Sequence, residues 1–196
     1  NNDCTLLSCP SMSGHEKDYN KYICVKNNYH LFDRGHPDAK HKRLNDNGNE
    51  VCDIFDWGGK RLIHVKKGKG LSDLSHLFRQ GDFSAEVIKM IPEARERVSS
   101  YLLEDGVSAP EITTGFDSRE FSVYFVKILG AGKPKKDMSF FSKVSFQRVV
   151  KNIKFKMGYK ECGLIFVRTL QKPSLISYSL NSTTLSRDVT FKIKKR

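Results

Sequence analysis

The chain has 196 residues, of which 38% are hydrophobic and 11% aromatic, and its formal net charge is +12. This length suits one substantial domain or two small lobes on a shared core, and the composition excludes a disordered chain. No apolar run approaches the roughly 20 residues that cross a bilayer, and the N-terminal residues lack a signal-peptide pattern, so we expect a cytoplasmic protein with no membrane partner.

Two short strands, 22–26 and 29–32, are predicted first, around an Asn-Asn turn. The polar segment 34–49 contains Gly, Pro and Asn-Gly turn signals and is predicted to be a loop. Its His36 and His41 do not have the spacing of zinc ligands, so we expect solvated loop histidines.

A hairpin is predicted next, from strands 50–56 and 60–67 that close on a Gly-Gly turn. In this register the numbers of opposed residues add up to 117, and a carboxylate faces a basic side chain at three positions. The pairs are Glu50 with Lys67, Asp53 with His64, and Asp56 with Arg61. Such cross-strand pairs contribute only a few tenths of a kcal/mol each, so fixing the register is a sufficient explanation for them.

Strand alternation gives the same hairpin a second interpretation. It predicts that Asp53 lies on a face with Phe55, and that His64 and Lys66 lie on the coinciding face of the next strand with Leu62. An acid, an imidazole and an ammonium among apolar side chains are costly unless they serve a function. This face of the hairpin is therefore the candidate catalytic site.

Helices are predicted to follow the hairpin. The first covers 72–80 and ends at Gly81, with His76 and Gln80 on its polar face. The second covers 84–103 and restarts at a proline, and a linker follows it.

A strand, a helix and another strand make up the predicted remainder. The strand 119–129 is followed by an amphipathic helix from residue 145 to Gly158, by the strand 159–170, and by an edge strand near 189–195. The order of elements predicts an α/β (α+β) fold, in which helices pack on a mixed sheet. We expect residues 1–110 to form a hairpin–helix core region, and residues 111–196 a basic region packed on the same sheet as one domain.

The basic region carries the whole excess of positive charge. Residues 131–196 hold 16 Lys or Arg against three acids, a net charge of +13, and residues 1–130 have a net charge of −1. This asymmetry predicts nucleic acid as the partner. The expected phosphate contacts are Lys133, Lys135, Lys136, Lys143, Arg148, Lys151, Lys154 and Lys156. The alternative is a solvated helix face, and Phe140, Phe141 and Phe155 are expected in the core rather than on a base-stacking surface.

The five cysteines are an odd number, widely spaced and without a C-x-x-C pair. This pattern predicts neither a disulfide framework nor a zinc ribbon. Cys24, Cys52 and Cys162 lie in apolar segments, where reduced cysteine behaves as a small hydrophobe, so we expect a reducing cytoplasm.

The hairpin and the helix after it resemble the core of the PD-(D/E)XK nucleases. The shared features are an acid on one strand, a Lys on the next strand, and a helix that carries Ser and Gln. There, two acidic groups hold Mg²⁺ and the Lys positions or activates the attacking water. The resemblance implies a nuclease-like core with Mg²⁺ on Asp53 and Glu50, and Asp56 and Glu86 are alternatives for the second ligand. The implied catalytic residues are Asp53, His64, Lys66, His76 and Gln80. His64 stands where the second acid is expected, and imidazole is a poorer Mg²⁺ ligand than carboxylate.

Cleavage without a metal is a second chemical option. His64 and His76 would then act as base and acid, and Lys66 would stabilise a phosphorane-like state. The structural alternative for His64 is a hydrogen-bonded histidine within a strand.

Three segments resemble the shared block of a bacterial family of sporadically distributed proteins of unknown function. They are EKDYNKY, EVCDIFDWGGKRLIHVKKGKGLSDLSHLFRQGDFSAEVI and MSFFSKVSFQRVVKNIKFKMGYK. The resemblance supplies no active site, and the patchy distribution of such proteins suggests defence-associated genes. The sequence therefore predicts a nucleic-acid-interacting protein, with DNA or RNA cleavage in antiphage defence as the leading hypothesis. The alternatives are a non-catalytic module that binds nucleic acid or a phage component, and a homo-oligomeric scaffold in a larger complex.

Overall fold

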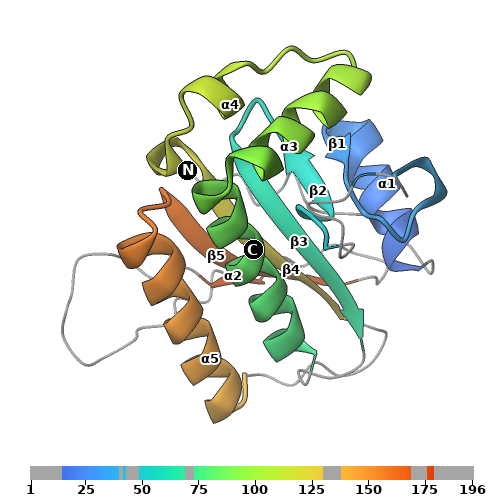
Figure 1. Ribbon diagram of the computed structural model, residues 1–196. Helices are drawn as coiled ribbons and strands as arrows, with labels where there is room; N and C mark the ends of the chain where they lie inside the picture. Colours follow the sequence, from blue (N-terminus) through green and yellow to red (C-terminus); the bar gives the residue numbers. More distant parts are fainter. Residues whose placement is uncertain are drawn as a thin grey trace.

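A six-stranded mixed sheet forms the centre of the computed structural model, which describes residues 15–39, 42, 49–68, 73–129, 138–168 and 176–178 (Figure 1). The strands are His30–Leu31 (β1), Ile54–Asp56 (β2), Arg61–Gly68 (β3), Ser122–Leu129 (β4), Glu161–Arg168 (β5) and Ile176–Tyr178 (β6), in the spatial order β1-β2-β3-β4-β5-β6. β3, β4 and β5 are parallel, whereas β1, β2 and β6 pair antiparallel with their neighbours. The predicted α/β class, with helices packed on a mixed sheet, is confirmed.

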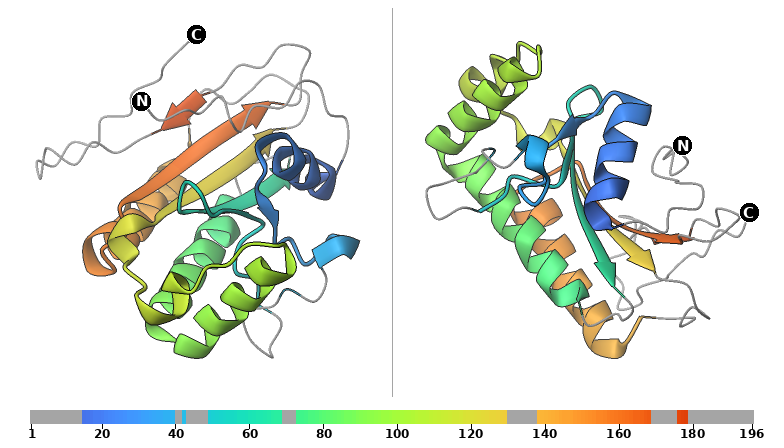
Figure 2. Two further views of the ribbon diagram at one scale, coloured as in Figure 1. Left: turned by 90° about the horizontal axis from the view of Figure 1, so that it is seen from above. Right: turned by 90° about the vertical axis from the view of Figure 1, so that its right-hand side faces the viewer.

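Helices cover both faces of this sheet (Figure 2). The helices are Glu16–Asn27 (α1), Leu74–Met90 (α2), Pro92–Glu104 (α3), Glu111–Thr114 (α4) and Phe140–Val150 (α5), with 3-10 turns at Pro37–Ala39 (η2) and Ser118–Glu120 (η3) and a π-helical turn at Lys151–Lys156 (η4). α1 packs with Ile63, Val65 and Val126 on one face, and α2, α3 and α5 form the larger core on the other. Among the described residues, no helix is both long and apolar enough to cross a membrane.

The first predicted strand, 22–26, is wrong, because these residues belong to α1. Tyr19 and Ile23, one helical turn apart, are both buried against the sheet, and Asp18 accepts the backbone N–H of His15 at 2.6 Å at the start of the helix. Asn28 ends the helix in the left-handed conformation, with φ 57°. Burying large apolar side chains stabilises by about 1.5–3 kcal/mol each, which outweighs the β propensity of this segment.

The hairpin has the predicted register over its paired part. Phe55 pairs with Leu62 and Asp56 with Arg61, and these two charged side chains form an ion pair. β2 begins only at Ile54, so Glu50 and Asp53 precede the strand and do not face Lys67 and His64 as predicted. Because β2 pairs only with the first residues of β3, the rest of that edge of β3 has no strand beside it, and the candidate site lies there.

α2 does not end at Gly81 but continues to Met90. A Cβ at Gly81 would lie 2.3 Å from Cε1 of Phe125 and 3.0 Å from Cδ2 of His64, so this glycine lets the helix lie close on β3 and β4. Ser84, where a second helix was predicted to begin, lies within α2 and donates its hydroxyl to the carbonyl oxygen of Glu50 at 3.0 Å. The predicted restart at Pro92 is confirmed as the start of α3.

The predicted strand, helix and strand after residue 118 are confirmed as β4, α5 with η4, and β5. Val123 and Phe125 of β4 share the larger core with the apolar face of α5. α5 begins earlier than predicted, at Phe140, because the Ser139 side chain caps it. The predicted edge strand 189–195 lies outside the described residues. Cys24, Cys52 and Cys162 are buried and not in disulfides.

Candidate functional site

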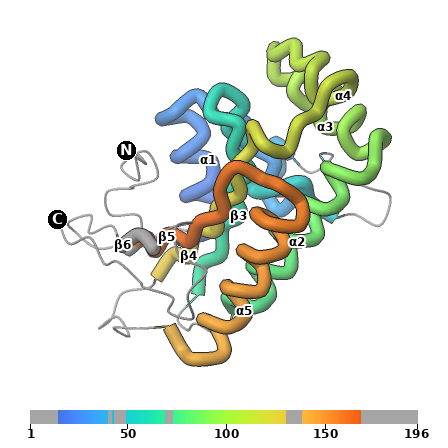
Figure 3. Tube along the Cα trace, turned by 90° about the vertical axis from the view of Figure 1, so that its left-hand side faces the viewer, coloured from blue at the N-terminus to red at the C-terminus, as the bar shows by residue number. Residues whose placement is uncertain are grey.

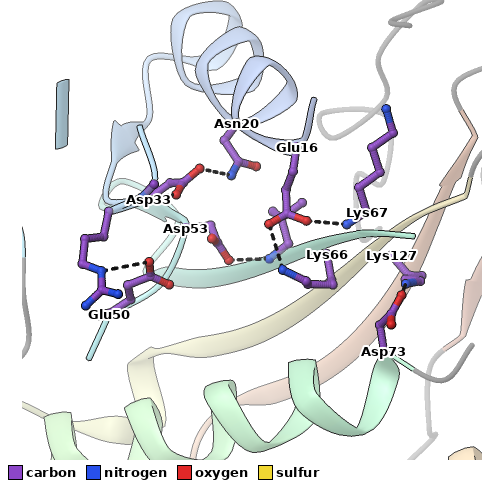
Figure 4. Close-up of polar contacts among 12 residues, drawn as sticks. Glu16, Asn20, Asp33, Glu50, Asp53, Lys66, Lys67, Asp73 and Lys127 are labelled. Carbon is purple, nitrogen blue, oxygen red and sulfur yellow. Dashed lines mark hydrogen bonds and ion pairs between the residues drawn. The ribbon is translucent and has the colours of Figure 1, made fainter. Parts of the chain in front are cut away.

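The second half of β3 has an edge that β2 does not cover, and carboxylates take the place of the missing strand. The backbone N–H of Val65 donates to Oδ2 of Asp53 at 2.6 Å, and that of Lys67 donates to Oε2 of Glu16 at 2.5 Å (Figure 4). Because alternate residues of a strand aim their N–H groups at the same edge, these two amides would otherwise be unpaired. Asp53 and Glu16 are thus fixed side by side along the edge of β3.

Lys66 belongs to the same cluster. Its Nζ lies 3.3 Å from Oε1 of Glu16, in the first turn of α1, and both side chains are partly exposed. Asp53 and Lys66, which strand alternation predicted to act together, both lie at this edge but have different partners, the Val65 N–H for Asp53 and Glu16 for Lys66. The sequence did not point to Glu16, because the segment after it was predicted to be a strand rather than a helix.

Two more carboxylates lie beside Asp53. Asp33 accepts hydrogen bonds from the Asn20 side chain and the Gly35 backbone, each at 2.8 Å. Glu50 has one carboxylate oxygen 3.8 Å from Nε of Arg34. Four acids, Glu16, Asp33, Glu50 and Asp53, thus lie near one another between α1 and the edge of β3 (Figure 4).

Burial and mutual repulsion change the acidity of this cluster. Burial, followed by the charge of Glu50, raises the pKa of Asp53 well above its ordinary value. Burial and the nearby Asp33 also raise the pKa of Glu50, although Arg34 and Lys66 oppose the increase. An acid with a raised pKa retains its proton closer to neutral pH, and acids perturbed in this way are common in active sites.

His64 lies on the other side of β3 from this cluster. Its ring is only 3% exposed and stacks on Phe125, with centroids 5.9 Å apart, beneath α2. Burial lowers the pKa of His64 to about 3, and its Nε2 atom has no hydrogen-bond partner among the described residues. The structure does not pair His64 with Asp53, because β2 begins only at Ile54, one residue after Asp53.

His76 and Gln80 are also outside the cluster. Both lie on α2, which packs on the face of the sheet opposite α1 (Figure 2). His76 is exposed and Gln80 half-buried, while Leu77 and Phe78 of the same helix are buried in the core. The polar face predicted for this helix thus points away from the sheet and from Asp53.

A buried lysine with a partly exposed carboxylate partner, which was not predicted from the sequence, lies at the same end of the sheet. Lys127 of β4 is fully buried, and its Nζ contacts Oδ2 of Asp73, at the start of α2, at 2.8 Å. Lys127 is the register neighbour of Lys66 across β3 and β4. A lysine inside the apolar run of β4 was the available signal. Ligands bind open α/β sheets beyond the carboxyl ends of parallel strands, where these two lysines lie.

The predicted nucleic-acid contacts lie on α5 and η4 so far as the structure describes them. Arg148, Lys151 and Lys156 are exposed, and Lys143 and Lys154 are half-buried. Residues 138–160 contain six Lys or Arg and no Asp or Glu. α5 lies at the side of the molecule, packed on α2 (Figure 3). Lys133, Lys135 and Lys136 fall outside the described residues.

Three aromatic side chains of this segment are exposed, which contradicts their predicted place in the core. Phe140 is 73%, Phe141 79% and Phe155 67% exposed. The helix buries Phe146, Val149 and Ile153 instead. Phe140 and Phe141 at the start of α5, and Phe155 in η4, lie off this buried face.

The predicted Mg²⁺ ligands are both members of the acidic cluster, but they are engaged with protein groups. Among the described residues, no group of three or more His, Cys, Asp or Glu side chains is arranged to hold a metal ion. Mg²⁺ binding by Asp53 and Glu50 stays a prediction, and so do the alternatives with Asp56 and Glu86. Asp56 is committed to its ion pair with Arg61.

Comparison with known proteins connects the chain to a family. A family model described as a family of unknown function (DUF6119) matches residues 2–168. No curated protein and no solved structure matches the chain.

Proposed function

This chain belongs to a family of unknown function, DUF6119, and we propose that it binds nucleic acid through the basic surface of α5 and η4. The observation that carries the proposal is the separation of charge. Six basic and no acidic side chains occur over 138–160, while Glu16, Glu50 and Asp53 gather on the opposite side of the sheet. Binding of a polyanion to such a surface releases counterions and is favoured at low salt.

Hydrolysis of the phosphodiester backbone is the second function that we propose. The arrangement of Glu16, Asp53 and Lys66 on the open edge of β3 favours it. Lys66 is partly exposed and would contact a phosphate oxygen, and a divalent cation such as Mg²⁺ on Asp53 and Glu50 would relieve their repulsion. His64, His76 and Gln80 have no part in this version of the site.

Cleavage of foreign DNA or RNA in the bacterial cytoplasm, as in antiphage defence, is the biological role that we propose for this chemistry. A binding module without cleavage, acting as a sensor of nucleic acid or of a phage component, needs only the α5 surface. A homo-oligomeric scaffold in a larger complex needs neither, so the two sites can be tested separately.

Labelled single- and double-stranded DNA and RNA, incubated with the protein and Mg²⁺, Mn²⁺ or EDTA, test both functions together. We expect salt-sensitive binding under all conditions and cleavage only with metal. Asp53→Asn and Lys66→Ala should abolish cleavage and leave binding unchanged, because neither residue lies on α5.

Asp117→Asn and Lys21→Ala are the matched controls, since both residues lie outside the acidic cluster and outside 138–160, and each forms a surface ion pair, with Arg119 and Asp38 respectively. They should cleave as the wild type does. Binding without cleavage under every condition would reject the hydrolytic function and leave the binding function. Cleavage that survives in Asp53→Asn would place the active site elsewhere.

A further inference from the structure

The exposed side of α5 and η4 carries aromatic and basic side chains in one stripe. Phe141, Arg148 and Phe155 are separated by seven residues each, and Val144 and Lys151 lie between them at the same spacing. On α5, residues seven apart such as Phe141 and Arg148 occupy nearly the same side of the helix, and the π-helical turn η4, which carries Lys151 and Phe155, continues α5 directly. Phe141, Arg148, Lys151 and Phe155 are all exposed, which confirms that this side faces solvent.

Neither end of the stripe is explained by the fold. Phe155 is exposed without an aromatic contact among the described residues, and Phe141 touches only the ring of Phe140, 5.8 Å away, which is itself exposed. Arg148 and Lys151 have no carboxylate partner in the described part of the chain. Exposed phenylalanine costs free energy in water, so two such residues beside unpaired cations indicate a partner with both charge and flat apolar faces.

We propose that this stripe, formed by Phe141, Arg148, Lys151 and Phe155, binds single-stranded nucleic acid by stacking unpaired bases on its two phenylalanines. The inference rests on the proposed nucleic-acid binding and specifies its substrate. In a duplex the base faces are stacked on one another, and only single strands or loops offer a face to an aromatic ring. Arg148 and Lys151, between the two rings, would meet the phosphates.

The length of the stripe fits a short strand. Phe141 and Phe155 are 14 residues apart along α5 and η4, so at most about 20 Å separates them along the helix axis at the α-helical rise of 1.5 Å per residue. A stacked strand advances about 3.4 Å per nucleotide, which gives about six nucleotides between the two rings.

Other occupants fit the stripe less well. Lysine is depleted from the centres of protein interfaces, and here Lys151 stands between the two rings. A helix that lies on a membrane presents one continuous apolar face, but Arg148 and Lys151 interrupt this one. A second copy of the chain and a lipid surface are therefore outcomes of the test rather than the proposal.

Fluorescence anisotropy in EDTA tests the inference without interference from cleavage. The probes are a labelled single-stranded oligothymidine of about 12 nucleotides and a labelled duplex of the same length. Phe141→Ala and Phe155→Ala should each weaken single-strand binding roughly 5- to 100-fold, the effect of losing one stacked base, and leave duplex binding unchanged. Phe155→Trp should retain single-strand binding, and its indole fluorescence should be quenched when the strand binds.

Leu103→Ala on α3 is the matched control, because Leu103 is an apolar side chain 66% exposed on another helix, and it should change neither affinity. Unchanged single-strand affinity in both phenylalanine variants, or an equal loss for strand and duplex, would overturn the inference and leave the proposed binding function in place. A wild type that binds neither probe at low salt would reject both. If the variants change the sedimentation mass and not the strand affinity, the stripe contacts a second copy of the chain. If they change binding to anionic vesicles and not the strand affinity, it contacts a lipid surface. Either result would overturn the inference.

Discussion

Asp53 and His64 are buried ionisable residues on opposite sides of β3, and each makes the stability of the fold depend on pH. The pKa of Asp53 is raised by burial and by Glu50, and the pKa of His64 is lowered by burial to about 3. Above about pH 3.9 the unfolded chain loses the Asp53 proton that the folded chain retains, so this group lowers stability as the pH rises. Below about pH 6.5 the unfolded chain protonates His64 and the folded chain does not, so this group lowers stability as the pH falls.

The Asp53→Asn variant should be more stable than the wild type at pH 8. Asparagine keeps an oxygen that accepts the Val65 N–H and removes the carboxyl group that is costly to ionise. We expect a gain of about 1.4 kcal/mol for each unit by which the pKa of Asp53 is raised, and no gain near pH 4. Urea unfolding at the two pH values measures the difference. A variant less stable than the wild type at pH 8 would show that the ionised carboxylate is stabilising.

The His64→Met variant should resist acid better than the wild type. Methionine has a similar volume, fills the space beside Phe125 and cannot be protonated. The wild type should lose up to about 1.4 kcal/mol more than the variant for each pH unit below about 6.5, until the folded pKa of about 3 is reached. Equal acid sensitivity of the two proteins would mean that His64 is protonated in the folded state.

Strand alternation in the sequence predicts only some of the residues in the acidic cluster. Asp53 and Lys66 were predicted as site residues because the Gly-Gly turn and the Asp56–Arg61 pair indicate the hairpin register, and both residues lie at the same edge of β3. His64 was predicted beside Asp53 because the sequence does not show that β2 begins only after Asp53. Glu16 comes from an element far along the chain, and such contacts depend on packing that no local pattern encodes.

At the scale of elements, close packing decides where helices begin and end. The predicted end of a helix at Gly81 follows from the usual role of glycine after a helix. Here the absence of a side chain allows α2 to contact Phe125 and His64, so the glycine lies inside the helix. In α1, buried Tyr19 and Ile23 outweigh the β propensity of the segment 22–26.

The Gly81→Ala variant tests this packing. Alanine favours a helix by about 1 kcal/mol, but its Cβ would overlap the Phe125 ring, and overpacking costs about 1–3 kcal/mol. We expect net destabilisation by about 1 kcal/mol in urea unfolding. Gly115→Ala is the control, since the nearest atom to a Cβ there is 3.9 Å away. Stabilisation at Gly81 would mean that α2 and β4 are farther apart than described.

At the scale of the whole molecule, the sheet separates two surfaces of different charge. The acidic cluster lies between α1 and the edge of β3, and the basic surface lies on α5 and η4 across the sheet. The sequence showed the excess of basic residues in the last third, and hence the nucleic-acid prediction, because charge counts need no fold. It could not show that Phe141 and Phe155 are exposed, because an amphipathic pattern with extra aromatic residues is compatible with either side of the helix.

The salt dependence of binding to a single-stranded oligonucleotide tests the central claim most directly. Each phosphate contacted contributes about −0.7 to the slope of log affinity against log salt, so three or more contacts predict a slope of about −2 or steeper. The double variant with Arg148→Ala and Lys151→Ala should reduce the magnitude of that slope by about 1.4. An affinity that does not change with salt, or no binding at low salt, would contradict the proposal that this chain binds nucleic acid.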